Sequence, residues 1–311
     1  MQLSLALMQN ITSMLLWVLV GFAVVKVGLV PGSSSKVLST LTVFVFCPAM
    51  IFHAFQIELT AGRLYGFVAC LLFSTTAYVV WMLLSRLLRR PLKLTPVEES
   101  SLVYGNVGNL VLPLVSMTLG DEMVFYASAI QIPFNLFFWT HGISVMQGHA
   151  GFEWKRIVKN LNLWAVLFGL VFLGFQWHLP SVLDTAVSGL SAMVAPASMM
   201  VVGMVLAGTD LRSVFTNVRA YGVLFGRLVV YPLLMLGLLW VSGLAVRFPA
   251  LVPVLLVTAV SLAAPTASNV AQLAVVFDEE PTYASVLNIL SLFACVLTIP
   301  AFIALYQLAF R

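Results

Sequence analysis

Two short runs of glycine, proline, amide and hydroxyl residues interrupt apolar segments that are long enough to cross a bilayer. The first has the sequence SLVYGNVGNLVLP at residues 101–113, and the second has the sequence SLAAPTASNVAQ at residues 261–272. Inside a bilayer, backbone groups freed by a helix break are tolerated only where they face protein or a polar cavity. One such break in each half of a chain is typical of a central solute-binding site. We therefore expect the chain to be non-helical near 106–110 and 264–268, and the two broken helices to cross near the midplane.

The two interruptions offer donors for an anion. Asn106 and Asn109 are three residues apart, so both amides can point to one side. If the helices are discontinuous, the half-helices that begin near Asn109 and Thr266 direct positive dipole ends at the midplane. A kinked helix with close packing at small residues is the alternative. The candidate residues from this pattern are Asn106, Gly108, Asn109, Pro265, Thr266, Ser268, Asn269 and Gln272.

Arg227 is the one charged residue deep in an apolar run. Eight residues separate it from Arg219 at the edge of that run, so it lies about 12 Å deep in a core about 30 Å thick. Such an arginine either contacts the solute or clamps carbonyl groups freed by Pro232 or by the breaks, and both roles remain open. No Asp or Glu lies in the middle of a run, which disfavours a cation carrier and suits a carboxylate-bearing solute.

Further polar residues in the apolar runs are weaker candidates. Gln131, Asn135 and Asn288 could line the site, although hydrogen bonding between helices is the favoured role. His141 is a minor candidate for proton coupling because histidine titrates near neutral pH.

Composition identifies an integral membrane protein. Charged residues make up 8% and apolar residues 61% of the chain, whereas a soluble domain has about 25% charged residues. The mean hydropathy is +1.06. A crossing helix needs about 20 apolar residues, and the chain has enough for ten all-α spans. The predicted spans are approximately 8–28, 36–56, 64–85, 101–120, 122–145, 160–178, 182–207, 220–243, 250–276 and 282–308.

The distribution of basic residues predicts the orientation in the plasma (cytoplasmic) membrane. Basic loops lie on the cytoplasmic side, so both termini are expected to be extracytoplasmic. Because the charges alternate between loops, the net charge of +4 does not indicate nucleic acid. The residues on the predicted cytoplasmic side are Lys26, Lys36, Arg86, Arg89, Arg90, Lys93, Lys155, Arg156, Lys159, Arg212 and Arg219, and those on the opposite side are Arg63, Arg247 and Arg311.

The chain repeats itself. Residues 121–128 and 278–285 share five of eight residues at an offset of 157, and this register superimposes the two interruptions. Upstream, Pro48 matches Pro196 at an offset of 148. We therefore predict two five-helix repeats, 8–150 and 157–310. Because five is odd, the second repeat is inverted in the membrane.

The motifs GNVGN…LPL at 105–114 and APTASN at 264–269 resemble those of the auxin efflux carrier family, in its bacterial branch of malonate and malate transporters. The resemblance implies crossed broken helices 4 and 9, a scaffold of spans 1, 2, 6 and 7, and an elevator-like transport domain of spans 3–5 and 8–10. It places the carboxylate at Asn109, Pro113, Pro265 and Asn269, with Pro48 and Pro196 facing it. The long central loop of plant members is missing here. The related bile-acid symporters use acidic sodium ligands, so sodium is a less favoured coupling ion than a proton.

The sequence thus predicts a secondary transporter of a small organic anion, such as malonate or malate. A carrier of a larger amphipathic or aromatic carboxylate and a membrane sensor with a carrier fold are the alternatives. No cofactor or metal is predicted, and a homodimer through the scaffold helices is expected. An enzyme is disfavoured, because no constellation of His, Asp or Glu within the spans could supply acid–base or metal chemistry.

Overall fold

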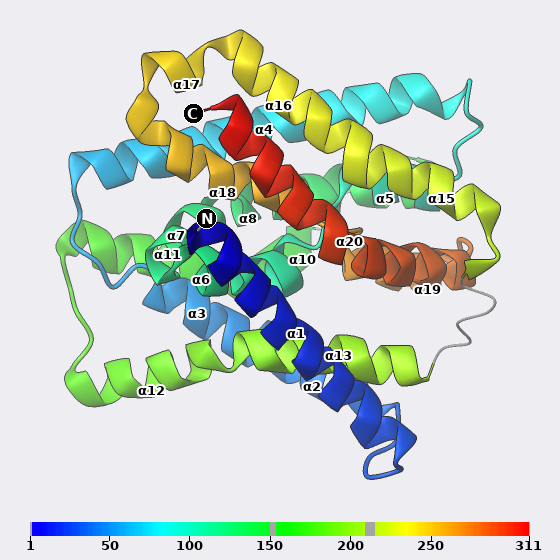
Figure 1. The fold of residues 1–311 in the computed structure, drawn as a ribbon, viewed down its shortest axis with the longest axis horizontal. Coiled ribbons are helices and arrows are strands. Elements are labelled where there is room, and N and C mark those ends of the chain that lie inside the picture. The colour runs from blue at the N-terminus through cyan, green and yellow to red at the C-terminus, as the bar shows by residue number, and fades with distance from the viewer. Residues whose placement is uncertain (1, 150–153, 209–214, 311) are drawn as a thin grey trace. The chain divides into compact units, whose positions relative to one another are not determined.

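The computed structural model describes residues 2–149, 154–208 and 215–310, and every regular element among them is a helix (Figure 1). Contacts divide the chain into two compact units. The first unit consists of Met1–Leu64, Gly108–Ser128 and Asn160–Leu211. The second unit consists of Tyr65–Val107, Ala129–Lys159 and Arg212–Arg311. Of the predicted basic positions, Arg212, Arg311 and the side chain of Arg156 lie outside the described part.

In the first unit, α1 packs along α13, and glycines allow the close approach (Figure 1). A Cβ atom on Gly21 would overlap the backbone of Met200, and one on Gly203 would overlap the backbone of Val18. The helices that contribute to this unit are α1 (Gln2–Lys26), α2 (Ser34–Leu41), η1 (Thr42–Phe46), α3 (Cys47–His53), α6 (Leu112–Leu119), α7 (Asp121–Ala129), α11 (Leu161–Phe175), α12 (Ser181–Ala192) and α13 (Val194–Ala207).

In the second unit, fully buried aromatic side chains form the core. The ring of Trp81 lies 5.7 Å from that of Tyr78 and 5.4 Å from that of Tyr231, as measured between centroids. The helices that contribute to this unit are α4 (Ala61–Arg89), α5 (Pro96–Val103), α8 (Gln131–Phe137), η3 (Phe138–Gly142), α9 (Ile143–Gln147), α10 (Trp154–Val158), α15 (Val218–Phe225), η4 (Gly226–Val230), α16 (Tyr231–Ser242), α17 (Leu244–Arg247), η5 (Pro249–Leu251), α18 (Val252–Leu262), α19 (Ser268–Phe277) and α20 (Pro281–Ala309).

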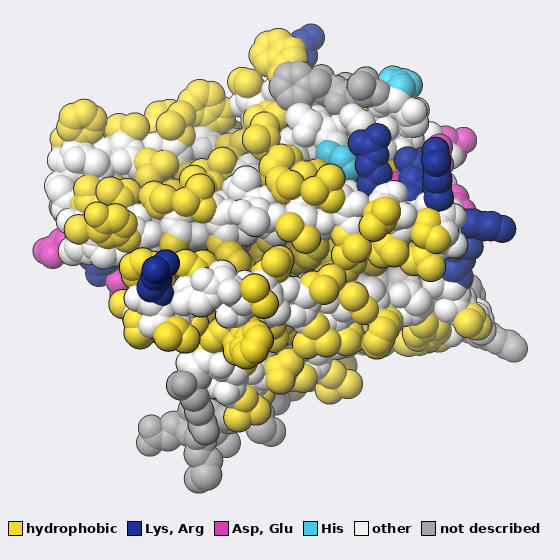
Figure 2. All heavy atoms as spheres, turned by 90° about the horizontal axis from the view of Figure 1, so that it is seen from above, with side chains coloured by type: hydrophobic (Ala, Val, Ile, Leu, Met, Phe, Trp, Pro, Cys, Tyr) yellow, Lys and Arg dark blue, Asp and Glu magenta, His cyan; other side chains and the backbone are white. Residues whose placement is uncertain are grey.

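The exterior is apolar, as a lipid-exposed surface requires. Hydrophobic side chains cover much of the face seen in Figure 2, and Leu72 and Leu297 are 62% and 77% exposed. Five helical stretches among the described residues are long and apolar enough to cross a bilayer. They are Ser34–His53, Ala61–Arg89, Ser181–Ala207, Val218–Ser242 and Pro281–Ala309. The predicted spans 101–120 and 250–276 instead consist of shorter helical pieces.

Candidate functional site

The first interruption begins where α5 ends. A capping box between Thr95 and Glu98 starts this helix, and the extended backbone of Tyr104 (φ −103°, ψ 120°) ends it. Residues 104–106 are not helical, and the π-helix η2 (Val107–Val111) follows. The prediction of a non-helical segment at 106–110 is therefore wrong for residues 107–110. A π-helical turn keeps the chain coiled directly after the break.

The second interruption lies between α18 and α19. Residues 263–267 have no helical assignment, and Ser268 is the first residue of α19. The predicted segment, 264–268, is thus displaced by one residue. Pro265 cannot donate a backbone hydrogen bond, and the extended backbone of Ala267 (φ −68°, ψ 133°) directs the chain into the next helix.

The two interruptions pair with each other inside the second unit. Gly105 and Thr266 form an isolated antiparallel bridge. The N–H of Asn106 donates to the carbonyl of Pro265 at 2.8 Å, and the N–H of Ala267 donates to the carbonyl of Tyr104 at 3.0 Å. Segments 160 residues apart thereby satisfy backbone groups that the helix breaks release.

Arg227 clamps the helix ends at this pairing. It is fully buried, and its Nε donates to the carbonyl of Ala264 at 2.9 Å. Its Nη1 donates to the carbonyls of Leu102 at 3.1 Å and Val103 at 3.3 Å. Helix C-termini leave such carbonyls without internal partners. Of the two roles that the sequence left open, these hydrogen bonds correspond to the second, in which the arginine holds carbonyl groups freed by the breaks.

Gly105 leaves the space that the guanidinium occupies. A Cβ atom at this position would overlap Nη2 of Arg227 and lie 3.1 Å from the Cβ of Ala264. The glycine is therefore required by the close approach of the Arg227 side chain.

Two side chains of helix α20 form hydrogen bonds with Thr266 in the second interruption. The hydroxyl of Ser291 accepts from the N–H of Thr266 at 3.1 Å and lies 3.0 Å from its hydroxyl. The amide of Asn288 donates to the carbonyl of Thr266 at 2.8 Å. Ser291 was not among the residues predicted from the sequence. Its spacing of three residues from Asn288 was the available signal, because residues three apart share a helix face.

The N-terminus of α19 presents further donors. The backbone N–H groups of Ser268 and Asn269 have no acceptor among the described residues. The amide of Asn106 donates to the hydroxyl of Ser268 at 3.2 Å, so this side chain is held at the same place. Asn269 is half-buried and Gln272 is exposed.

Gln131 and Asn135 are buried in α8, where the amide of Asn135 donates to the carbonyl of Gln131 at 2.8 Å. This hydrogen bond lies within one helix. His141 lies in η3, and its Nδ1 is 3.0 Å from the hydroxyl of Tyr104, the residue at the first break.

The remaining predicted site residues belong to the first unit. Gly108 lies in η2, and Pro113 occupies the first turn of α6. Pro48 and Pro196 lie near the starts of α3 and α13. The side chain of Asn109 is outside the described part of the structure.

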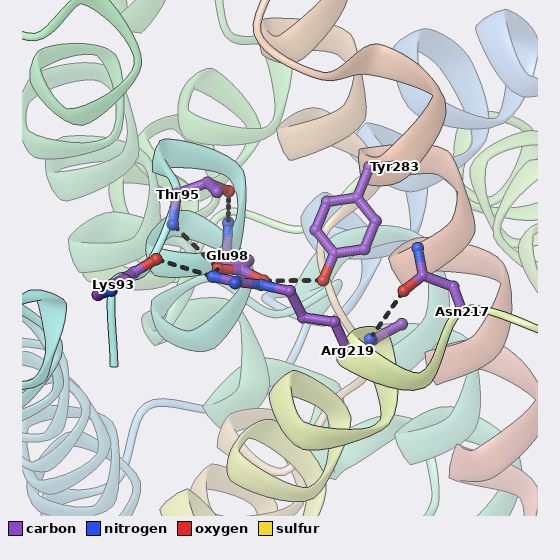
Figure 3. Close-up of polar contacts among 7 residues, drawn as sticks. Lys93, Thr95, Glu98, Asn217, Arg219 and Tyr283 are labelled. Carbon is purple, nitrogen blue, oxygen red and sulfur yellow. Dashed lines mark hydrogen bonds and ion pairs between the residues drawn. The ribbon is translucent and has the colours of Figure 1, made fainter. Parts of the chain in front are cut away.

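A buried carboxylate holds the start of α5 (Figure 3). Glu98 accepts from Nη2 of Arg219 at 2.7 Å, from the hydroxyl of Tyr283 at 2.8 Å and from the N–H of Thr95 at 2.9 Å. Arg219 also donates to the carbonyl of Lys93 at 2.7 Å. Burial alone would raise the pKa of Glu98, but these hydrogen bonds outweigh it and lower the pKa. The network joins α5, α15 and α20.

Within residues 2–149, 154–208 and 215–310, no group of three or more His, Cys, Asp or Glu side chains could hold a metal ion. The paired helix breaks, the amide and hydroxyl donors and the apolar exterior are typical of a membrane transport protein.

Comparison with known families supports this class. The family model described as "Membrane transport protein" matches residues 6–153 and, a second time, residues 150–303. The chain therefore belongs to this family, the auxin efflux carrier family, and is a multi-pass membrane protein. The double match indicates an internal repeat. No curated protein matches the chain significantly.

Proposed function

We propose that this protein is a secondary active, elevator-type carrier of a small organic anion, and that a dicarboxylate such as malonate or malate binds beside the paired helix breaks. The observation that carries the proposal is the N-terminus of α19. Two backbone N–H groups there, those of Ser268 and Asn269, have no acceptor among the described residues, and they adjoin the amide of Asn269 and the Asn106–Ser268 pair. Backbone donors and the helix dipole at such a terminus stabilise a negative charge.

The charges around the breaks are consistent with an anion. Arg227 is the buried cation at the pairing, and its hydrogen bonds go to backbone carbonyls rather than to a carboxylate. The two buried carboxylates on α5 already have basic partners: Glu98 is paired with Arg219, and Glu99 lies 3.4 Å from Nε of Arg89. In the proposal, Arg227 acts on the anion through its positive potential and through the geometry of the carbonyls that it holds.

The proposed topology is ten spans in two inverted repeats, with spans 4 and 9 broken at residues 104–106 and 263–267. The double family match and the bridge between Gly105 and Thr266 support it. Both termini are extracytoplasmic in this topology, because basic loops favour the cytoplasmic side.

The proposed mechanism moves spans 3–5 and 8–10 against a scaffold of spans 1, 2, 6 and 7. The division of the chain into two compact units supports this assignment in outline. The first unit contains the predicted spans 1, 2, 6 and 7, and the second contains spans 8–10 and most of span 3. Spans 4 and 5 contribute to both units. A carrier needs such a division, because one part moves while the other stays in the bilayer.

Uptake of radiolabelled malonate and malate into proteoliposomes tests the proposed function. We expect saturable uptake that an unlabelled dicarboxylate inhibits, and that responds to an imposed pH gradient more than to sodium. Empty liposomes and the Asn269→Ala variant serve as controls. If a large amphipathic carboxylate is taken up and neither dicarboxylate is, the proposed substrate is wrong. Binding of a dicarboxylate without any uptake would favour a sensor.

A further inference from the structure

A basic groove lies at the C-terminal end of α4. It has a volume of about 930 Å³ and is open to the surface. Four cationic and three leucine side chains surround it, and all belong to one continuous segment of the second unit. They are Leu83, Arg86, Leu87, Arg89, Arg90, Lys93 and Leu94.

Glu99 is the counter-charge beside this basic groove, and it interacts electrostatically with Arg89 and Arg86. Nε of Arg89 lies 3.4 Å from a carboxylate oxygen of Glu99. The side chains of Arg86, Arg90 and Lys93 are exposed, and they form no hydrogen bond or ion pair with any residue that the structure describes. The donors of Arg86, Arg90 and Lys93 are therefore open to an anion from outside the chain, and of the three only Arg86 is close enough to Glu99 to interact with its charge.

The leucines give the basic groove an apolar side. Leu83 and Leu87 are 64% and 73% exposed. With Arg86 and Arg90 they form a stripe at helical spacing, because residues three and four apart share a face. Arg90 lies about 10 Å further along the helix axis than Leu83. One helix face thus carries both the apolar side chains of Leu83 and Leu87 and the basic side chains of Arg86 and Arg90.

From this arrangement we infer that the basic groove binds an anionic phospholipid. The phosphodiester accepts hydrogen bonds from the guanidinium groups of Arg86 and Arg90, and an acyl chain lies along Leu83 and Leu87. Arginine suits this role because its planar group binds phosphate through two parallel donors. The proposed cytoplasmic location of this end of α4 places the basic groove at the leaflet surface, where anionic headgroups attract basic side chains.

The test compares binding of fluorescent phosphatidylglycerol and fluorescent phosphatidylcholine to the purified full chain in a neutral detergent. The variants are Arg86→Gln/Arg90→Gln and, as a control with the same loss of charge, Lys26→Gln/Lys36→Gln. The control removes two exposed lysines from the same predicted side of the membrane. A thermal melt of each variant establishes that it is folded.

We expect wild type and the lysine variant to prefer phosphatidylglycerol over phosphatidylcholine, and the arginine variant to bind phosphatidylglycerol roughly tenfold or more weakly. Equal losses in both double variants would overturn the inference, because only the general surface charge would then matter. No loss in the arginine variant would also overturn it. If the double variant unfolds, Arg90→Gln alone, in the turn after α4, carries the same prediction. Dicarboxylate transport is measured separately, so its failure does not affect this result.

Discussion

Nε of Arg227 lies 2.9 Å from the carbonyl oxygen of Ala264, two residues after the end of α18. The same guanidinium donates to the carbonyl of Leu102 in α5. One buried side chain thus joins the last turn of α5 to the segment that follows α18, and these are far apart in the sequence. This relationship makes Arg227 a structural residue of the paired breaks, and it determines the first prediction.

Arg227→Gln is expected to destabilise the protein by about 3 kcal/mol or more, because buried carbonyl groups lose charge-assisted hydrogen bonds. Thermal unfolding in detergent measures the loss. Arg247→Gln is the control, since Arg247 is exposed at the end of α17, and its melting temperature should not change. Unchanged stability of Arg227→Gln with loss of dicarboxylate binding would show instead that the guanidinium contacts the solute.

Gly105→Ala should destabilise the protein by about 1–3 kcal/mol, because the added methyl group overlaps the guanidinium of Arg227. Gly222→Ala in α15 is the matched control. A Cβ atom there meets nothing within 4 Å, so the substitution should be neutral or slightly stabilising. Equal melting temperatures for the two variants would contradict the packing at the first break.

Glu98→Gln is expected to lower the free energy of unfolding by about 1–3 kcal/mol at pH 7, because the buried carboxylate accepts hydrogen bonds from three residues. Glu122→Gln, which breaks an exposed ion pair with Arg63, should cost less. The difference is measured as a shift in melting temperature. If both substitutions have the same effect, the network of Figure 3 does not stabilise the protein.

The stabilisation by Glu98 should depend on pH. The folded-state pKa of this group lies below its ordinary value of 4.5, so its contribution is present above pH 4.5. The contribution is lost as the pH falls through the lower, folded-state pKa. The difference in melting temperature between wild type and Glu98→Gln should therefore shrink below pH 4.5. A difference that stays constant at lower pH would mean that Glu98 is not ionised in the folded protein.

The orientation is tested with single introduced cysteines, because Cys47, Cys70 and Cys295 are buried and should give little background. Pro91→Cys follows α4, and Ala250→Cys lies in η5, directly before α18; both positions are exposed. In intact cells an impermeant maleimide should label Ala250→Cys, and it should label Pro91→Cys only after permeabilisation. The reverse pattern would invert the topology.

The sequence predicted both helix breaks to within a few residues, because proline and paired glycines act locally on the backbone. It could not predict which carbonyls Arg227 contacts, since those belong to the end of α5 and to the break after α18 and meet only in the folded chain. Ser291 was not predicted because its one signal, the spacing of three residues from Asn288, does not reveal that both side chains meet Thr266 in the folded chain. The π-helical segments, such as Gly226–Val230 around Arg227, were also not predicted. One extra residue in a helical turn leaves no clear trace in an all-apolar run.

The central claim, that an anion binds beside the paired breaks, is tested most directly by the affinity of purified protein for malonate. Asn269→Ala removes an amide donor at the N-terminus of α19 and should weaken binding roughly ten- to hundredfold. Gln307→Ala, an amide about 24 Å along α20 from Ser291, is the control and should bind as wild type does. Wild-type affinity in folded Asn269→Ala protein would contradict the account, because the anion would then bind elsewhere.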